Sequence, residues 1–256
     1  MTTTPRSGTI SWVDLSTPDV DDACRFYRDL LGWELALSST PMGDYWVATV
    51  DGRDVAGLMA QSAESIGQPA TWTVFVWCEQ LDATLEQIGS AGGQTLVPPF
   101  EIPGGARVAV VADPGGAMFA LISGGPEPGE YFSSDVGGVA WAELMTRQID
   151  VSVTFYREVF GWSVATSDSG GTPYNVFSLD GVEVAGMIET PRDLPSDLPA
   201  SWSMYFVVDT CRAAEERVHE LGGQVLLSST PTPMGPFAVV SDRQGAVFQL
   251  MELQGE

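Results

Sequence analysis

Two short strand-like segments each combine a tryptophan with a carboxylate two positions later. Trp12 and Asp14 lie in the segment SWVDL, and Trp141 and Glu143 lie in AWAEL, 129 positions further along the chain. Because side chains alternate between the two faces of a β-strand, each pair should point to the same side of a sheet. An indole offers a flat stacking surface, and a carboxylate can accept a hydrogen bond or pair with a cation. The repeated pairs are therefore the leading candidates for a ligand site.

The carboxylates of Asp14 and Glu143 admit three roles. A carboxylate beside a tryptophan is costly to bury alone, so an internal bond to an arginine or a backbone amide is one interpretation. The second is contact with a ligand hydroxyl or amine. The third is general acid/base catalysis, because burial would raise the pKa of either group. Tyr45 and Tyr174, again 129 positions apart, could supply a second polar group to each site.

The charge of the chain excludes several classes of function. The formal net charge is −23, and 34 acidic residues stand against 11 basic ones, all of them arginine. A phosphate-binding surface needs a basic patch, so we expect no nucleic-acid partner. A chain without lysine cannot use Schiff-base catalysis or a phosphate-loop lysine.

Cysteine usage and hydropathy indicate a cytoplasmic protein. Cys24, Cys78 and Cys211 are odd in number and widely spaced, which favours reduced thiols. The chain opens without a secretory leader, and its apolar segments are shorter than a membrane span. We therefore expect a soluble protein without membrane contact.

The elements that must position the tryptophan–carboxylate pairs occur in a repeated order. A strand over 8–15 leads into a helix that Thr17-Pro18-Asp19 begins and Gly32 ends. Strands over 33–37, 45–50 and 55–60 follow, and Asp51-Gly52 predicts a hairpin between the last two. The order recurs as a strand over 72–78, a helix over 81–91 and strands over 95–97, 107–112 and 117–122. Each repeat is a βαβββ unit.

The second half of the chain replays the first at a nearly constant offset. Phe26-Tyr27 returns as Phe155-Tyr156, and Gly32-Trp33 returns as Gly161-Trp162. Residues 125–135, GPEPGEYFSSD, are rich in Gly, Pro and acidic residues and are predicted to form a linker. The sequence therefore predicts an α+β protein of four βαβββ units, with one domain over 8–124 and a second over 136–252.

These features resemble the vicinal oxygen chelate superfamily. The resemblance is carried by the tandem βαβββ units, a helix that ends FYRDLLGW, and the segment DPGGAMFAL late in a unit. The superfamily includes glyoxalase I, extradiol dioxygenases and the bleomycin- and fosfomycin-resistance proteins. The resemblance covers nearly all of residues 8–252 and is greatest for actinobacterial two-domain members with glyoxalase-like or hydroxylase-like labels. It implies paired units whose sheets curl around a cleft.

The resemblance also implies a divalent-metal site, but the residues at its positions are unsuitable. Superfamily enzymes usually hold the metal with His, Gln or Glu on the first strand of each unit and on a late strand. Indole and alanine cannot ligate a metal, so we expect no metal and no other cofactor. His219, the only histidine, is expected on an exposed helix face. The carried-over first-strand positions are Trp12, Trp72, Trp141 and Trp202, and the late-strand positions fall near 57–59, on Ala120, near 186–188 and on Gln249.

The residues left at the implied cleft positions are mainly aromatic, apolar or sulfur-containing. A mostly apolar pocket with a few polar groups is typical of a small-molecule site. A purely structural role in the core is the alternative, and it is the expectation for Trp33 and Trp162. The candidate ligand residues are Trp12, Asp14, Tyr45, Met59, Trp72, Val74 and Val76 in the first half, and Trp141, Glu143, Tyr174, Trp202, Met204, Phe206 and Gln249 in the second.

The sequence thus favours a metal-independent protein that binds a planar, largely apolar small molecule. An antibiotic or polyketide-like metabolite that is neutral or cationic would fit, and the role would be sequestration, resistance or accessory work in biosynthesis. The main alternative is a metal-free tailoring enzyme (a lyase, isomerase or hydroxylase-like protein) with Asp14 or Glu143 as general acid/base. A metal-dependent glyoxalase or dioxygenase is the third. We expect a monomer or a homodimer.

Overall fold

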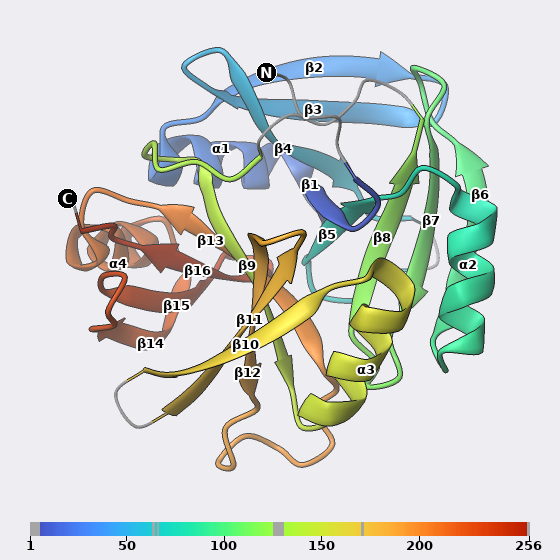
Figure 1. Cartoon of the computed structure of the whole chain (residues 1–256). Helices are drawn as coiled ribbons and strands as arrows, with labels where there is room; N and C mark the ends of the chain where they lie inside the picture. Colours follow the sequence, from blue (N-terminus) through green and yellow to red (C-terminus); the bar gives the residue numbers. More distant parts are fainter. Residues whose placement is uncertain (1–5, 63–64, 66, 125–130, 170–171, 255–256) are drawn as a thin grey trace. The chain divides into compact units, whose positions relative to one another are not determined.

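The computed structural model describes residues 6–62, 65, 67–124, 131–169 and 172–254, and it contains four βαβββ modules (Figure 1). Module 1 comprises β1 (Thr9–Thr17), α1 (Val20–Leu31), β2 (Glu34–Thr40), β3 (Gly43–Val50) and β4 (Arg53–Ala60). Module 2 comprises β5 (Thr71–Trp77), α2 (Leu81–Ser90), β6 (Gln94–Glu101), β7 (Arg107–Ala112) and β8 (Met118–Ser123). Module 3 comprises β9 (Val139–Thr146), α3 (Ile149–Phe160), β10 (Ser163–Ser169), β11 (Thr172–Leu179) and β12 (Val182–Glu189). Module 4 comprises β13 (Ser201–Val207), α4 (Cys211–Glu220), β14 (Gln224–Thr230), β15 (Phe237–Ser241) and β16 (Val247–Met251).

The first helix shows why the local sequence folds as predicted. The Asp19 side chain accepts a hydrogen bond from the Asp22 backbone N–H at 3.0 Å, and so caps the start of α1. Gly32 ends the helix in the left-handed conformation with φ 72°, which glycine adopts without a steric penalty. Between these ends, Ala23, Phe26 and Tyr27 form the buried face of the helix.

The strands form two eight-stranded sheets, one from each half of the chain. The first has the order β2-β3-β4-β1-β5-β8-β7-β6, and the second has the order β10-β11-β12-β9-β13-β16-β15-β14. In each sheet the first strand of a module pairs in parallel with the last: Asp14 lies opposite Gly57, and Glu143 lies opposite Gly186. This result confirms the predicted α+β fold of four repeated units. The predicted domain and linker bounds stay predictions, and residues 125–130 of the linker lie outside the described residues.

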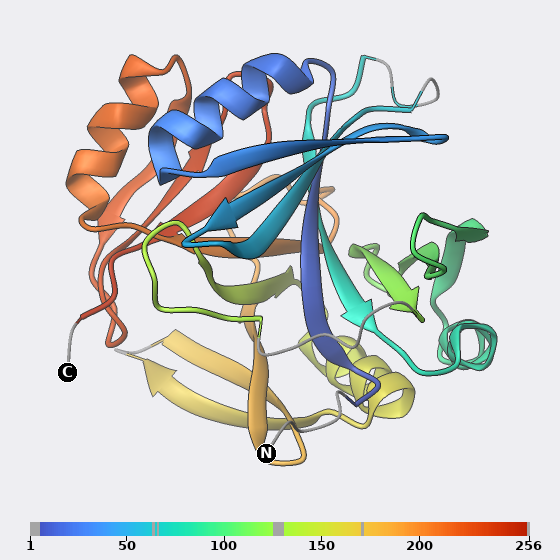
Figure 2. The same cartoon turned by 90° about the horizontal axis from the view of Figure 1, so that it is seen from above.

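Contacts along the backbone group the modules into two compact units, each drawn from both halves of the sequence. One unit joins modules 1 and 4 with residues 131–141, and in it α1 lies beside α4 (Figure 2). The other joins modules 2 and 3, and in it α2 lies beside α3 (Figure 1). Each unit therefore has a helix pair and a core of its own.

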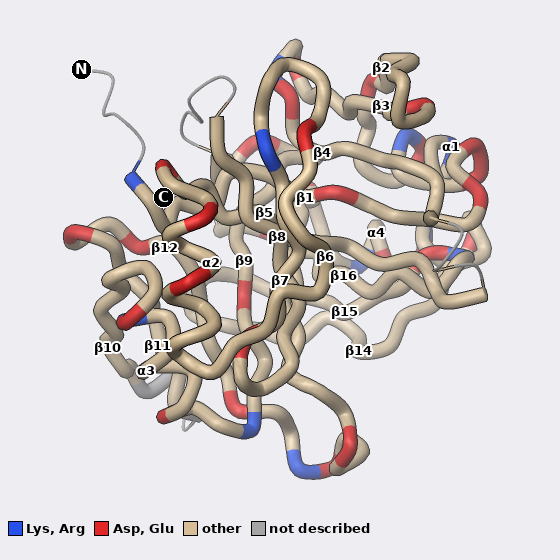
Figure 3. The backbone as a smooth tube through the Cα atoms, turned by 90° about the vertical axis from the view of Figure 1, so that its right-hand side faces the viewer, with Lys and Arg blue, Asp and Glu red and all other residues tan. Residues whose placement is uncertain are grey.

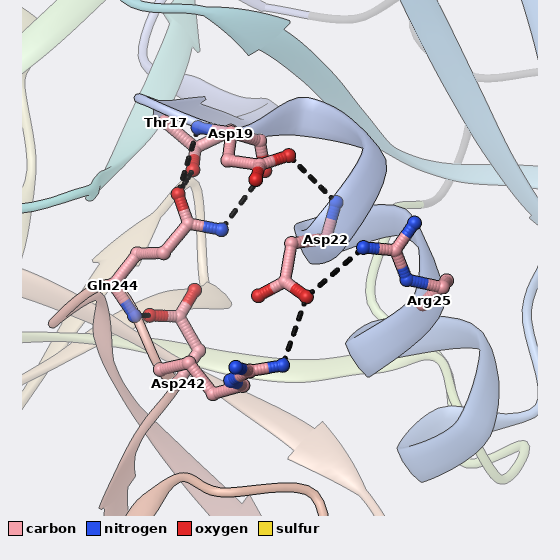
Figure 4. Close-up of polar contacts among 7 residues, drawn as sticks. Thr17, Asp19, Asp22, Arg25, Asp242 and Gln244 are labelled. Carbon is pink, nitrogen blue, oxygen red and sulfur yellow. Dashed lines mark hydrogen bonds and ion pairs between the residues drawn. The ribbon is translucent and has the colours of Figure 1, made fainter.

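In the unit of modules 1 and 4, a glutamine from module 4 completes the start of α1. Gln244 Oε1 accepts from the Asp19 backbone N–H at 2.8 Å and from the Thr17 hydroxyl, while Gln244 Nε2 donates to the Asp19 carbonyl at 2.8 Å (Figure 4). Arg243 adds a salt bridge to Asp22 at 3.0 Å. These contacts tie the two modules together at the helix N-terminus.

Each core contains a buried tyrosine that links a tryptophan to an aspartate. Tyr27 accepts from Trp72 Nε1 at 3.0 Å and donates to Asp242 at 3.1 Å. Burial raises the pKa of Asp242, and the adjacent carboxylate adds to the effect of burial in raising the pKa of Tyr27. In the other unit, Tyr156 accepts from Trp202 at 2.9 Å and donates to Asp113 at 3.1 Å. The duplicated bonds show that these polar groups are satisfied within the core.

The distribution of charged residues in the structure reflects the acidic composition of the chain. Acidic residues occur on elements throughout the described chain, and arginines are few (Figure 3). No helix among the described residues is long and apolar enough to span a membrane.

Candidate functional site

The first tryptophan–carboxylate pair forms a closed hydrogen-bonded cluster with a tyrosine. Trp12 Nε1 donates to Asp14 Oδ1 at 2.7 Å and to the Tyr45 hydroxyl oxygen at 2.9 Å. The Tyr45 hydroxyl donates to the same Asp14 oxygen at 2.7 Å. Asp14 is only 7% exposed, whereas Trp12 and Tyr45 are half-buried. The cluster therefore combines a buried carboxylate with two aromatic rings that are partly open to solvent.

Strand pairing brings the three residues together. Trp12 and Asp14 share one face of β1, and Asp14 lies opposite Gly57 of the parallel strand β4. Tyr45 lies on β3 opposite Met59 of β4, so the hydroxyl reaches Asp14 across β4. A Cβ atom on Gly57 would overlap both the Tyr45 hydroxyl and the Asp14 carboxylate. Gly57 therefore provides the space in which the cluster forms.

Burial controls the acidity of the cluster. It raises the pKa of Asp14 from its ordinary 3.8 to about 6, although the hydrogen bonds from Tyr45 and Trp12 act in the opposite direction. Burial and the neighbouring Asp14 carboxylate raise the pKa of the Tyr45 hydroxyl. Near neutral pH, Asp14 is therefore mostly ionised and Tyr45 is protonated, which matches the donor and acceptor roles seen in the structure.

A residue in the second half of the predicted linker also contacts the cluster. The Tyr131 ring lies 6.0 Å from the Trp12 ring, centroid to centroid, at an interplanar angle of 46°. The Tyr131 hydroxyl donates to the Val55 carbonyl at 2.6 Å. The composition of residues 125–135 predicted a linker and gave no indication that Tyr131 makes this contact. The adjacent aromatic residues in GPEPGEYFSSD are the signal that could have indicated it.

The second pair occupies equivalent positions in module 3. Glu143 is 5% exposed and lies opposite Gly186 on β12, as Asp14 lies opposite Gly57. Tyr174 lies opposite Ser167 on the neighbouring strand, as Tyr45 lies opposite Ser38. The two halves of the chain therefore repeat the same backbone arrangement around their carboxylates.

The tryptophans of β5 and β13 belong to the core, which corrects the expectation that they line a cleft. Trp72, Val74 and Val76 share one face of β5 and are at most 6% exposed. Phe75 lies opposite Ala120 in the β5–β8 pair, as Asp14 lies opposite Gly57 in the β1–β4 pair. Thr73, not Trp72, is therefore the counterpart of Trp12. A shift of one residue moves a side chain to the other face of a sheet.

The same shift by one residue applies to the candidate ligand residues in module 4. Trp202, Met204 and Phe206 share one buried face of β13, and Phe206 packs against Trp33 at 5.3 Å between ring centroids. The opposite face carries Ser203 and Tyr205, and Ser203 donates to Gln249. The continuous apolar face of Trp202, Met204 and Phe206 was the sequence signal for a core position. Trp33 and Trp162 are fully buried, and His219 is exposed, as predicted.

The donor set does not fit the divalent metal that the superfamily implies. The corrected first-strand positions are Trp12, Thr73, Trp141 and Ser203, and Gln249 is engaged by Ser203. Asp14 Oδ1 already accepts two hydrogen bonds. Within the described part of the chain, no three His, Cys, Asp or Glu side chains gather as a metal site would require.

Two surface hollows of the described structure lie away from these residues. One, of about 410 Å³, is lined by Ala83, Glu86, Gln87, Ser90, Ala91 and Glu158. The second, of about 360 Å³, is lined by Arg147, Gln148, Ile149, Asp150, Val151 and Glu189. Neither contains a buried carboxylate or an aromatic ring, so the Trp12–Asp14–Tyr45 cluster remains the candidate site.

Comparison with known proteins identifies relatives along the whole chain. The Mycobacterium tuberculosis protein CFP32, named provisionally as a glyoxylase, is 33% identical over 253 residues, which are 96% of this chain and 95% of the relative. The anthracycline biosynthesis protein DnrV of Streptomyces peucetius is 32% identical over 260 residues, which are 96% of this chain and 94% of the relative. Among solved structures, the Mn(II)-bound glyoxalase of Novosphingobium aromaticivorans aligns with a TM-score of 0.65 at 16% identity, covering 97% of this chain and 83% of the other.

The structural match supports the fold alone, because its sequence identity is low. The sequence relatives and the repeated βαβββ modules support membership of a family more directly. A family profile matches residues 9–121 and again residues 138–250, one match for each half of the chain. The chain therefore belongs to the Glyoxalase/Bleomycin resistance protein/Dioxygenase superfamily.

Proposed function

We propose that the protein binds a planar, largely apolar small molecule at the Trp12–Asp14–Tyr45 cluster without the help of a metal. The observation that carries this proposal is the fixed geometry of the cluster: Trp12 donates its single N–H to Asp14 and Tyr45, so its ring is held in one orientation. A ring that is already ordered loses little entropy when a ligand stacks on it. Met59, opposite Tyr45 on β4, adds an adaptable apolar side chain.

The relatives favour a ligand class. Two relatives are named as anthracycline biosynthesis proteins and match nearly the full chain. A planar aromatic polyketide of the anthracycline type would match the aromatic character of the cluster. The role would be sequestration, resistance or accessory work in a biosynthetic pathway.

Charge favours a neutral or cationic ligand over an anion. Asp14 is largely ionised near neutral pH, and the net charge of the chain is −23. A ligand amine near this carboxylate gains a charge-assisted hydrogen bond, whereas a carboxylate or phosphate would meet like charge. For the same reason we propose no nucleic-acid partner.

The test is the affinity of the protein for an anthracycline with an amino sugar and for its N-acetyl derivative. Trp12→Ala should weaken both by about 1–3 kcal/mol, because each loses a stacking surface. Asp14→Asn keeps the shape of the cluster but removes its charge, so the preference for the amine should disappear. Addition of a chelator should leave both affinities unchanged.

Met118→Ala is a suitable control, because Met118 is an exposed apolar residue on β8 of the other compact unit. Equal affinities for wild type and a folded Trp12→Ala variant would exclude the cluster as the binding site. An unchanged preference for the amine in Asp14→Asn would assign any discrimination to the long-range field of the protein.

A metal-free enzyme is the second candidate, and one observation favours it. The pKa of Asp14 is raised to about 6, which suits proton transfer near neutral pH. In this reading Asp14 would remove or return a proton at a carbonyl or phenol of the bound molecule. Turnover of the anthracycline by wild type and its loss in Asp14→Asn would favour catalysis, whereas binding without turnover would favour an accessory role.

A further inference from the structure

A short segment at the end of the predicted linker contacts the aromatic face of the candidate site. We define the aromatic strap as residues 131–135, with the sequence YFSSD. Its first two residues are aromatic, and the ring of each contacts one tryptophan. Tyr131 contacts Trp12 at 6.0 Å, and Phe132 contacts Trp141 at 5.3 Å, measured between ring centroids. One segment thus supplies a ring to the tryptophan of each duplicated pair.

The contact between Tyr131 and Trp12 excludes a ligand from the same face. Aromatic layers in contact lie about 3.5–4 Å apart, so a planar molecule between two rings needs about 7 Å or more. The centroids of the Tyr131 and Trp12 rings are 6.0 Å apart, and the two rings are tilted by 46°. A planar ligand cannot enter between them while Tyr131 keeps this position.

Polar contacts hold the strap in place. The Tyr131 hydroxyl donates to the Val55 carbonyl at 2.6 Å, and the Ser133 backbone N–H donates to the Val139 carbonyl at 2.8 Å. Arg53, the first residue of β4, donates to the Ser133 hydroxyl at 3.1 Å and forms a salt bridge with Asp135. Asp135 also accepts from the Ser133 hydroxyl at 2.9 Å.

The strength of this attachment is modest. Arg53 and Asp135 have side chains that are 56% and 50% exposed, and exposed ion pairs contribute little to stability. The strap has no regular secondary structure. The hydrogen bond from the Tyr131 hydroxyl to Val55 is part-buried, but the contacts of Arg53 with Ser133 and Asp135 are exposed to solvent. A segment without regular secondary structure that is held by a few such contacts can open locally without unfolding the sheet beneath it.

We infer that the strap is an intramolecular competitor for the Trp12 face, and that Tyr131 and its attachment through Arg53 determine which planar ligands gain access. The inference rests on the proposed function, because it concerns the same site. A ligand that stacks on the face of Trp12 that Tyr131 contacts must displace Tyr131, and its apparent affinity is reduced by the fraction of time that the strap is closed. Large planar molecules that replace both the ring contact and the Val55 hydrogen bond are favoured over small ones.

Two measurements test the inference in the full chain. Acrylamide quenching of fluorescence reports access to Trp12 without any ligand, when the signal of each protein is compared with that of its Trp12→Phe counterpart. Binding of the amino-sugar anthracycline reports competition directly. The variants are Tyr131→Ala, which removes the ring, and Arg53→Ala, which weakens the attachment. Arg212→Ala is the matched control, since Arg212 is an exposed arginine on α4.

Tyr131→Ala should increase quenching of Trp12 and tighten anthracycline binding by about 5- to 20-fold. Arg53→Ala should increase the quenching of Trp12 and the affinity for the anthracycline by roughly 2- to 5-fold. Arg212→Ala should change neither the quenching nor the affinity. Unchanged quenching in both strap variants would overturn the inference, as would weaker anthracycline binding in Tyr131→Ala. If no protein binds the anthracycline, the proposed function fails, and the quenching result still decides whether the strap controls access to Trp12.

Discussion

Asp14 shows how one buried side chain can contribute both to stability and to recognition. Its folded-state pKa of about 6 lies above its ordinary value of 3.8, because burial disfavours the ionised form. Between these values the folded protein binds more protons at this site than the unfolded chain does. The contribution of Asp14 to stability is therefore fully present below pH 3.8 and is lost as the pH rises through about 6.

We predict that Asp14→Asn removes this pH dependence. The asparagine oxygen can still accept from Trp12 and Tyr45, so the cluster should persist without its charge. Between pH 4 and pH 7, the free energy of unfolding of wild type should fall relative to that of the variant by up to about 3 kcal/mol. Urea unfolding at intervals of about one pH unit measures the difference.

Two controls make this comparison specific. Burial also raises the pKa of Asp113 and Asp242, but both residues are present in wild type and variant and cancel in the difference. Asp44→Asn removes an exposed carboxylate in the β2–β3 hairpin and serves as the control for the loss of one negative charge. If the difference in the free energy of unfolding between wild type and Asp14→Asn stayed constant between pH 4 and pH 7, the raised pKa would not belong to Asp14.

At the scale of elements, the parallel β1–β4 pair makes the cluster possible. Gly57 lies opposite Asp14, and its missing side chain leaves room for the Tyr45 hydroxyl to cross β4. The equivalent glycine, Gly186, lies opposite Glu143 in the second sheet. A glycine inside a strand weakens the strand, and the space that Gly57 leaves for Tyr45 and Asp14 explains its presence in β4.

We predict that Gly57→Ala destabilises the protein by about 1–3 kcal/mol, because the new methyl group forces the Tyr45 and Asp14 side chains to move. The same variant should lose anthracycline binding if the cluster is the binding site. Thermal or urea unfolding measures the first effect, and titration measures the second.

Gly89→Ala in α2 is the matched control. A Cβ atom there would meet no atom within 4 Å, and the residue lies in an exposed helix position. This substitution should stabilise the protein by about 0.5–1 kcal/mol, since alanine is the better helix former. A Gly57→Ala protein as stable as wild type would show that Tyr45 and Asp14 do not meet above this glycine.

At the scale of the whole molecule, uncompensated negative charge opposes folding. The net charge is −23, and the arginine ion pairs of the described residues are mostly exposed. Exposed pairs contribute little each, whereas repulsion acts among all the acidic groups. Screening by salt should therefore weaken the repulsion more than it weakens the ion pairs.

We predict that NaCl stabilises the protein. The melting temperature should rise as NaCl increases from roughly 20 mM to roughly 500 mM, a range over which the Debye length falls well below 10 Å. Choline chloride at the same ionic strength should give a similar rise, which separates screening from binding of sodium ions. A melting temperature that falls steadily with either salt would show that the ion pairs outweigh the repulsion.

The fold and part of the site could be predicted from local sequence patterns. Helix caps such as Asp19 and helix ends such as Gly32 depend on a few neighbouring residues. The 129-residue offset between the duplicates is found by comparing the two halves of the sequence. They were sufficient for the four modules and for the alternation that places Trp12 beside Asp14. The wrong assignment of Trp72 and Trp202 arose because the face of a strand depends on its pairing register, which neighbouring residues do not fix.

Residue types and short-range spacing were enough to predict the repeated βαβββ order, the strong negative charge and the pairing of an aromatic ring with a carboxylate. Spacing could not predict that Trp12, Asp14 and Tyr45 share one set of hydrogen bonds over Gly57. Nor could spacing predict that Tyr131, 119 positions beyond Trp12, contacts the Trp12 ring. Contacts of this kind depend on strand register and on packing between distant segments, and both are properties of the folded chain as a whole.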